Sequence, residues 1–218
     1  MDIEQIKKAL NDEDPQQRMK GIRELRNCEA DVAAPLLLQH VNDSEFLVRS
    51  FVAMGLGRKQ SEEAFQALLK MSEQDKDPNV RAEAANSISF YGDVAIPYLR
   101  KMYEFDNHWL VRRSIIAAIV DLKCPQELLE ICQIGLKGED EPVMESCLSA
   151  LGLLAGSSQE TEALNLLLAF VDDRSWRIRL QVAKSLGRYK NDQAIAALSK
   201  LKTDEDHRVV GAVLESTI

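Results

Sequence analysis

Five arginines recur at a nearly constant interval, and they are the first residues whose type and spacing point to chemistry. Arg18, Arg49, Arg81 and Arg112 follow one another after 31, 32 and 31 residues, and Arg179 lies 67 residues further on. A row of guanidinium groups could bind anions. The alternative is that each arginine bonds turn carbonyls and an aspartate of a neighbouring repeat. We favour this structural role, because a residue in register with a repeat usually stabilises the repeat.

Cysteine chemistry is the second possibility. The four cysteines, Cys28, Cys124, Cys132 and Cys147, form no Cys-x-x-Cys pair, which is typical of a reduced, cytoplasmic chain. Cys124 precedes Pro125 at an expected helix start, where a thiol pKa is lowered, so it is a candidate to receive a metal or cluster. The alternative is a small buried hydrophobe. A zinc or iron–sulfur site needs three or four clustered ligands, and we predict no metal site.

Enzyme motifs are missing from the sequence. It contains no Gly-x-Ser-x-Gly elbow, no phosphate-binding P-loop and no Gly-x-Gly-x-x-Gly after a strand. The carboxylate pairs fall in solvated turns, where nothing raises their pKa. Classical catalysis therefore has little support, and a bilin lyase-like activity is the one enzymatic option that we keep open.

These residues sit in a repeated element. The same frame begins at Asp12, Asp43, Asp75, Asp106 and Asp173, and two less regular copies begin at Glu139 and Asp204. A helical apolar pattern follows each arginine, such as Val52, Ala53 and Leu56 before Gly57. Self-similarity at this period indicates a repeat protein, and seven copies cover the chain. Strand signals are absent, so each copy is expected to be a pair of helices.

The helix starts and ends follow from local rules. The second helix of a copy begins at a proline or an aromatic residue, namely Pro15, Phe46, Pro78, Trp109, Pro142 and Trp176. Proline suits the first helical turn, and the preceding Asp can cap free amides there. Gly57 and Gly187 are placed to end their helices. We predict helices over 2–11, 15–27, 31–41, 45–57, 61–72, 78–91, 94–104, 108–121, 125–137, 141–154, 159–171, 175–188, 192–201 and 206–216.

Stacked pairs of such helices form an α-solenoid. A single pair cannot bury its apolar face, so we expect residues 1–218 to form one domain, an all-α right-handed superhelix of about seven repeats of two antiparallel helices. No apolar run approaches the length needed to span a bilayer. The last helix ends with the apolar residues Val209, Val210, Val213, Leu214 and Ile218. Either a second copy of the chain or another partner could cover this end.

The repeat resembles a known family. The pattern Asp-x-x-x-x-Val-Arg-x-x-x-Ala-x-x-Leu-Gly is similar to the short HEAT repeat of the phycobilisome-lyase type along the whole chain, and segments 46–57, 108–113 and 204–211 resemble one cyanobacterial group of HEAT-repeat proteins. That resemblance implies relatives among bilin lyase subunits, phycobilisome degradation factors and a HEAT-repeat partner of the A-type iron–sulfur assembly protein.

The chain departs from the family pattern in places. Met144 or Glu145 replaces the arginine in the fifth copy, and Val210 replaces it in the seventh, so arginine–aspartate bonding is in doubt there. Deoxyhypusine hydroxylases with this fold bind iron through paired His-Glu dipeptides. Here His40 and His108 are followed by Val and Trp, and His207 is followed by Arg, so that chemistry is not expected.

A partner-binding stripe is the main functional hypothesis. Second helices line the concave side of such a stack, and one stripe of each faces outward. Phe51, Met54 and Phe90 are out of place on that stripe, and cationic residues flank them; an apolar patch with a charged rim is typical of a partner site. The alternative is that Phe51 and Met54 tuck between helices. The predicted groove comprises Arg23, Phe51, Met54, Arg58, Phe90, Arg113, Lys184 and Arg188.

An aromatic edge is a separate hypothesis. Phe46, Trp109 and Trp176 share one position at the start of second helices. Tryptophan is enriched at binding hot spots, so these residues could anchor a partner. The alternative, which we favour, is that each packs its helix start against the adjoining first helix.

Charge limits the choice of ligand. The formal net charge is −8, from 27 basic and 35 acidic residues, which argues against nucleic acid or an anionic membrane as the main ligand. Nearly half of the acids lie in the turns before second helices, so the remaining surface is net basic. A basic groove can therefore lie beside an acidic edge.

Three functions remain open. The first is a non-enzymatic scaffold that binds a protein in its groove, and the resemblance implies an A-type iron–sulfur carrier, with a shared cluster, or a phycobiliprotein. The second is a bilin-handling protein of the lyase or chromophore-detachment class, with phycocyanobilin as ligand, since arginines around Phe and Met suit two propionates and an apolar body. The third is a general adaptor with no cofactor.

Overall fold

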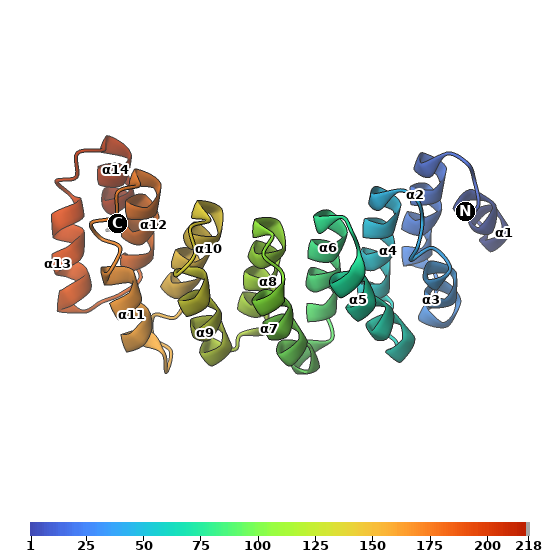
Figure 1. The fold of residues 1–218 in the computed structure, drawn as a ribbon, viewed down its shortest axis with the longest axis horizontal. Helices are drawn as coiled ribbons and strands as arrows, with labels where there is room; N and C mark the ends of the chain where they lie inside the picture. The colour runs from blue at the N-terminus through green and yellow to red at the C-terminus, as the bar shows by residue number, and fades with distance from the viewer. Residues whose placement is uncertain (217–218) are drawn as a thin grey trace. The chain divides into compact units, whose positions relative to one another are not determined.

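The computed structural model describes residues 1–216, and regular structure in that range is entirely helical (Figure 1). The helices are α1 (Ile3–Leu10), α2 (Pro15–Glu24), α3 (Ala30–Leu38), α4 (Phe46–Arg58), α5 (Glu62–Gln74), α6 (Pro78–Ser89), α7 (Ile96–Phe105), α8 (Trp109–Leu122), α9 (Pro125–Gly135), α10 (Glu141–Gly152), α11 (Glu160–Leu168), α12 (Trp176–Leu186), α13 (Asp192–Leu201) and α14 (His207–Ser216). Two 3₁₀ turns, η1 (Leu25–Asn27) and η2 (Gly92–Ala95), complete the set.

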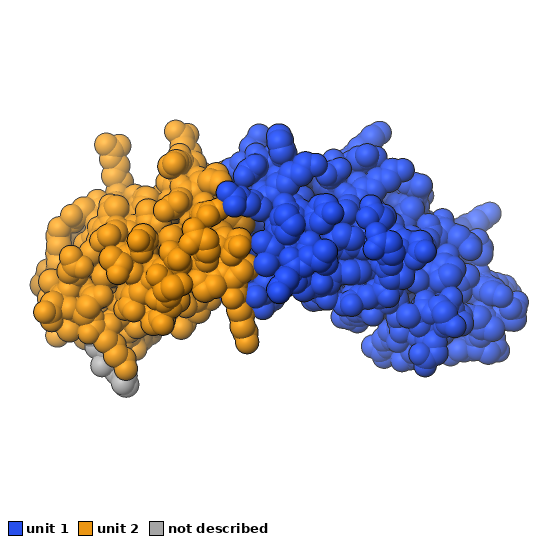
Figure 2. Space-filling model, turned by 90° about the horizontal axis from the view of Figure 1, so that it is seen from below, with its two compact units in different colours: residues 1–122 blue, residues 123–218 orange. Residues whose placement is uncertain are grey.

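The chain divides into two compact units, Met1–Leu122 and Lys123–Ile218 (Figure 2). In unit 1 the second helices α2, α4, α6 and α8 pack on one another in succession, each with a first helix beside it. In unit 2 the same holds for α10, α12 and α14. Leucines and isoleucines from both helix sets fill each interior, for example Leu37, Leu56 and Ile88 in unit 1, and Ile131 and Leu148 in unit 2.

The predicted all-α solenoid of helix pairs is confirmed. All fourteen predicted helices occur, with ends within three residues of the prediction. Five second helices begin at the expected proline or aromatic residue, and Pro142 is the second residue of α10. The Asp14 carboxylate accepts a hydrogen bond from the Gln16 amide at 2.9 Å, and Asp77 accepts one from Asn79 at 2.8 Å, as expected of helix caps.

One of the two glycines predicted to end helices does so. Gly57 does not end α4, because the helix continues through Arg58. Gly187 is the C-cap of α12, in the right-handed helical conformation rather than the left-handed one. Both glycines also permit close helix packing. A Cβ atom added at Gly57 would lie 2.7 Å from Cβ of Ser87, and one at Gly187 would lie 2.3 Å from Cβ of Ser216. The absence of a side chain is therefore a requirement of packing between second helices.

The C-terminal helix is partly covered. Val209 and Val213 of α14 are buried, whereas Leu214 is 48% exposed. Ile218, named with them in the sequence analysis, lies outside the described residues. Within residues 1–216, none of the helices combines the length and the apolar character required to cross a bilayer.

Candidate functional site

The recurring arginines are structural, as predicted. The Arg18 guanidinium donates to the two Asp43 carboxylate oxygens at 2.7 and 2.8 Å, and to the Asp12 and Glu13 carbonyl oxygens at 2.9 Å. The same arrangement joins Arg49 to Asp75, Arg81 to Asp106 and Arg179 to Asp204. These guanidinium groups already bond carboxylates and carbonyls, so they do not form a ladder for a foreign anion.

Arg112 uses different partners. Its guanidinium donates to the Asp106 carbonyl oxygen at 2.9 Å and to Oδ1 of Asn107 at 2.8 Å, and it lies 5.3 Å from the centre of the Tyr103 ring. All of these partners belong to its own repeat. This arginine therefore stabilises the turn in front of α8.

The structure resolves which residue replaces the arginine in the fifth repeat. Val48, immediately before Arg49, is fully buried, and its counterpart in α10 is the buried Val143. Met144 therefore occupies the arginine position, and Glu145 follows it. In α14 the buried Val209 is the counterpart of Val48, so Val210 occupies the arginine position there.

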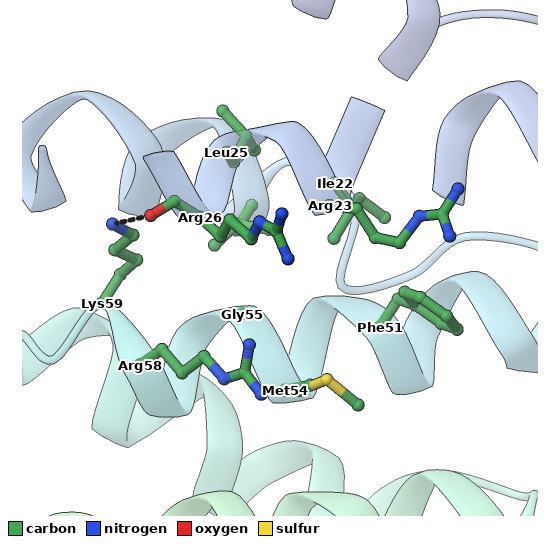
Figure 3. Close-up of a pocket in the computed structure, with 10 residues that line it drawn as sticks. Ile22, Arg23, Leu25, Arg26, Phe51, Met54, Gly55, Arg58 and Lys59 are labelled. Carbon is green, nitrogen blue, oxygen red and sulfur yellow. Dashed lines mark hydrogen bonds between the residues drawn. The ribbon is translucent and has the colours of Figure 1, made fainter. Parts of the chain in front are cut away.

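A pocket opens in unit 1 between α2, η1 and α4, and we call it the α2–α4 pocket (Figure 3). Its volume is about 150 Å³. The wall is apolar: Leu25 and Leu37 are buried, and the side chains of Phe51 and Met54 are half-buried along α4. A large apolar group could enter here without displacing a charged side chain.

Three exposed arginines form the rim of the α2–α4 pocket. Arg23 and Arg26 reach it from α2 and η1, and Arg58 reaches it from α4 (Figure 3). Among the ion pairs of residues 1–216, none includes any of these three. The lining contains no carboxylate. The rim is therefore a concentration of positive charge beside an apolar wall.

Lys59 is the fourth cation of the lining, and its role is structural. Its ammonium group donates to the Arg26 carbonyl oxygen at 2.9 Å, the bond drawn in Figure 3, and also to the Cys28 carbonyl oxygen. These carbonyls lie at the end of η1, where helical bonding stops and free acceptors remain. Lys59 thus fixes the backbone that carries Arg26.

The structure brings together half of the predicted groove. Arg23, Phe51, Met54 and Arg58 all line the α2–α4 pocket. Phe90 does not; it follows α6, is 46% exposed, and its carbonyl accepts a hydrogen bond from the Gln60 amide at 2.6 Å. The remaining predicted cations are exposed elsewhere, at Arg113 in α8 of unit 1 and at Lys184 and Arg188 in unit 2.

Arg26 is the functional candidate that the sequence analysis missed. The sequence predicts an α-helix through residue 27, and that helix would not turn Arg26 toward the same stripe as Arg23. The chain instead tightens into a 3₁₀ turn over Leu25–Asn27. Successive side chains then rotate by about 120° rather than about 100°, so Arg26 reaches the pocket. No residue type in this stretch signals the change.

The aromatic edge has a different environment at each position. Trp109 is 40% exposed, stacks on His108 and lies 5.7 Å from the Arg113 guanidinium. Trp176 lies against two guanidinium groups, those of Arg177 at 4.8 Å and Arg208 at 3.2 Å. The second of these contacts joins α12 to α14. Phe46 is half-buried at the start of α4.

Two of the four cysteines, both in unit 2, are buried like hydrophobic side chains. Cys132 and Cys147 are fully buried, and a hydrogen bond between them, together with burial, raises the pKa of the Cys132 thiol well above its usual value. Cys124 is half-buried in front of α9, and Cys28 is half-buried after η1. Within residues 1–216, no cluster of three or more His, Cys, Asp or Glu side chains could hold a metal ion.

Comparison with known families identifies the class of the protein. HEAT repeats match residues 34–120 and 128–217, which is most of the chain. The chain therefore belongs to the HEAT-repeat family, consistent with the helix pairs and with their recurrent arginine–aspartate bonds. No curated protein sequence matches it.

Two solved structures illustrate the similarity. YibA of Escherichia coli shares 18% sequence identity, with a TM-score of 0.69 over 97% of this chain and 80% of the other. A chain from the complex of CpcE and CpcF of phycocyanin lyase from Nostoc sp. PCC7120 also shares 18% identity, with a TM-score of 0.56 over 99% of this chain and 95% of the other. At this level of identity the similarity shows the fold alone.

Proposed function

We propose that the chain is a non-catalytic HEAT-repeat scaffold that binds a protein partner at the α2–α4 pocket. The supporting observation is the coincidence of a half-buried apolar pair, Phe51 and Met54, with three arginines that form no ion pair within residues 1–216. An apolar centre with a charged rim is the usual anatomy of a protein interface, and arginine is enriched there. The recurring arginines, by contrast, serve the fold.

The size of the pocket favours a protein over a small molecule. A volume of about 150 Å³ matches cavities that hold a single benzene ring. Pockets that enclose whole cofactors or drug-sized ligands are larger, about 300–1,000 Å³. One phenylalanine, leucine or methionine side chain from a partner would fill the α2–α4 pocket, while the rest of the interface spreads over the neighbouring surface.

The sequence resemblance supplies two candidate partners, an A-type iron–sulfur carrier and a phycobiliprotein. The scaffold proposal predicts that one of them binds the purified chain in a calorimetric titration. Arg58→Glu should weaken that binding about tenfold or more, because the side chain is exposed and its reversal opposes a charge-assisted contact. Lys70→Glu, an exposed cation of α5 outside the pocket, is the matched control and should change it less than about twofold.

The titration can contradict the proposal in two ways. Binding by neither protein would remove both candidate partners. Binding that survives both Arg58→Glu and Phe51→Ala without loss would show that the α2–α4 pocket is not the site. Helical content measured by circular dichroism confirms that each variant has folded.

A bilin-handling function is the second candidate, and one observation favours it. A linear tetrapyrrole has an apolar body and two propionates, which match the Phe51–Met54 wall and the rim arginines. The similar fold of a phycocyanin lyase chain is compatible with this function. Purified protein mixed with phycocyanobilin should then show a shifted, sharpened visible spectrum that Arg58→Glu abolishes. An unchanged spectrum would argue against the whole class.

A further inference from the structure

We infer that the α2–α4 pocket recognises an acidic linear segment of its partner, in which one large apolar side chain enters the pocket and neighbouring Asp or Glu carboxylates bond the rim arginines. The inference rests on the proposed scaffold function and specifies the chemistry of the bound segment. Its three supports are the charge of the rim, the placement of the guanidinium groups and the size of the apolar cavity.

Charge complementarity is the first support. Arg23, Arg26 and Arg58 are absent from the ion pairs of residues 1–216, although the chain as a whole is acidic, with a net charge of −8. The Arg58 charge acts on Glu83 of α6. Burial raises the pKa of the Glu83 carboxyl overall, against smaller opposing effects of hydrogen bonds from Asn86 and Ser87 and of the Arg58 charge. Guanidinium groups bind carboxylates in paired, charge-assisted hydrogen bonds. The rim therefore selects anionic partners.

The placement of the guanidinium groups is the second support. Arg26 extends into the α2–α4 pocket from the η1 side, and Arg58 runs along α4 toward Met54 on the other side (Figure 3). A carboxylate on each side of an anchoring residue could then meet one arginine each. Gly55 packs closely against Leu37 of α3, because an added Cβ there would lie 2.9 Å from the Leu37 side chain.

The cavity size limits the apolar part of the segment to one residue. A volume of about 150 Å³ suits one aromatic ring. Two adjacent large side chains would not fit, since each fully buried apolar side chain needs its own surroundings. The segment therefore has a single apolar anchor, unlike an amphipathic helix that presents several anchors along one face.

The experiment is a selection of random 12-residue peptides, displayed on phage, against the immobilised full-length chain. Each enriched peptide is then synthesised with a fluorescent label and titrated by anisotropy. We expect enriched sequences to contain one Phe, Leu, Met or Trp with at least two acidic residues within four positions. Replacement of those acids by their amides, or of the anchor by Ala, should weaken binding about tenfold or more.

Substitutions in the chain test whether the selected peptides bind at the α2–α4 pocket. Arg26→Glu and Arg58→Glu should each weaken binding of the selected peptide about tenfold, whereas Lys70→Glu should leave it within about twofold. Three results would each overturn the inference. The selection could enrich peptides without acids, it could enrich none, or Arg26→Glu and Lys70→Glu could weaken peptide binding equally. Tighter, Arg26-dependent binding of a labelled single-stranded oligonucleotide would also overturn it, and would make the rim a nucleic-acid site.

The outcomes separate this inference from the scaffold proposal. A partner whose binding depends on Arg58, together with peptides that lack acids, would overturn only the acidic-segment inference. A partner whose binding ignores Arg58 and Phe51 would overturn the scaffold proposal itself, whatever peptides the selection yields.

Discussion

Arginine has two distinct roles in this chain, and burial separates them. The Arg179 side chain is 9% exposed and its partner Asp204 is 7% exposed, so neither charge is solvated without the other. Arg23, Arg26 and Arg58 are exposed and need no partner to be stable. A buried charge that loses its partner is strongly destabilising. The two groups should therefore respond differently to mutation.

Loss of a recurring arginine should destabilise the fold. Arg49→Met leaves the nearly buried Asp75 carboxylate unpaired and removes two bonds to turn carbonyls, so we expect a loss of about 3–5 kcal/mol in the free energy of unfolding, measured with urea. The control is Lys101→Met, whose pair with Glu73 is 61% and 49% exposed, and for which about 1 kcal/mol or less is expected. Similar losses of unfolding free energy in Arg49→Met and Lys101→Met would contradict the distinction between buried and exposed ion pairs.

Acid should weaken the fold through the same carboxylates. The hydrogen bonds from Arg179 lower the pKa of Asp204. Burial raises the pKa of Asp43 and Asp75, but their hydrogen bonds, including those from Arg18 and Arg49, lower it by more, so that the net shift is downward. The pKa of these carboxyls is lower in the folded chain than in the unfolded chain, where it is near 3.9. Their contribution to the stability of the fold is therefore complete above about pH 3.9, and it is lost as pH falls through the folded pKa.

The expected result is a urea midpoint that is steady from about pH 7 to pH 5 and falls below about pH 4. Asp204→Asn should lower the midpoint at neutral pH and flatten the decline in acid, since one of the titrating groups is gone. A midpoint that stays constant down to about pH 3 would show that these bonds contribute little.

At the scale of the element, spacing between second helices depends on paired small residues. Gly57 faces Ser87 across α4 and α6, and Gly152 faces Ser185 across α10 and α12. Ser185 also donates from its hydroxyl to the Leu148 carbonyl oxygen at 2.8 Å, which ties the two helices together. Closely packed interiors tolerate few added atoms, so these positions limit how near the helices can approach.

Two alanine substitutions should have opposite effects. Gly57→Ala places a Cβ 2.7 Å from Cβ of Ser87, and overpacking of this kind costs about 1–3 kcal/mol. Gly211→Ala, in α14, meets nothing within 4 Å and should stabilise the chain by about 0.4–1 kcal/mol. Thermal and urea unfolding measure both effects. Equal stabilisation by the two substitutions would show that helix propensity, rather than packing against Ser87, determines the effect of Gly57→Ala on stability.

The sequence predicts the elements better than the site. Prolines, aspartates and the apolar period locate the helices, because these signals act within one turn. The sequence does not predict that Arg26 lines the pocket, because a 3₁₀ turn at Leu25–Asn27 changes the rotation per residue. It also does not predict the packing role of Gly57, since that role depends on Ser87, a residue in the next second helix. The first feature is a local change of helix type that no residue in the stretch signals, and the second is a contact between helices that local pattern does not report.

At the scale of the whole molecule, each compact unit contains its own core and a single tryptophan. Trp109 lies in unit 1 and Trp176 in unit 2. We propose that residues 1–218 nevertheless fold as one domain, because repeats in a solenoid are stabilised by their neighbours. The two tryptophans supply separate fluorescence probes for this proposal.

Single-tryptophan variants test cooperativity. Trp109→Phe leaves Trp176 as the probe of unit 2, and Trp176→Phe leaves Trp109 as the probe of unit 1. We expect the two fluorescence transitions in urea to coincide with each other and with loss of helical circular dichroism. Separate midpoints, after correction for the effect of each substitution on stability, would show that the units unfold independently.

The Lys59 bond to the η1 backbone has a kinetic consequence. Because the carbonyls of Arg26 and Cys28 are already held, the proposed partner would meet a surface that needs no loop ordering before contact. Its encounter would then depend on diffusion and on the field of the rim arginines, so added salt should slow association more than it speeds dissociation. We expect Lys59→Met, which removes both hydrogen bonds to the turn, to slow association in the same measurement.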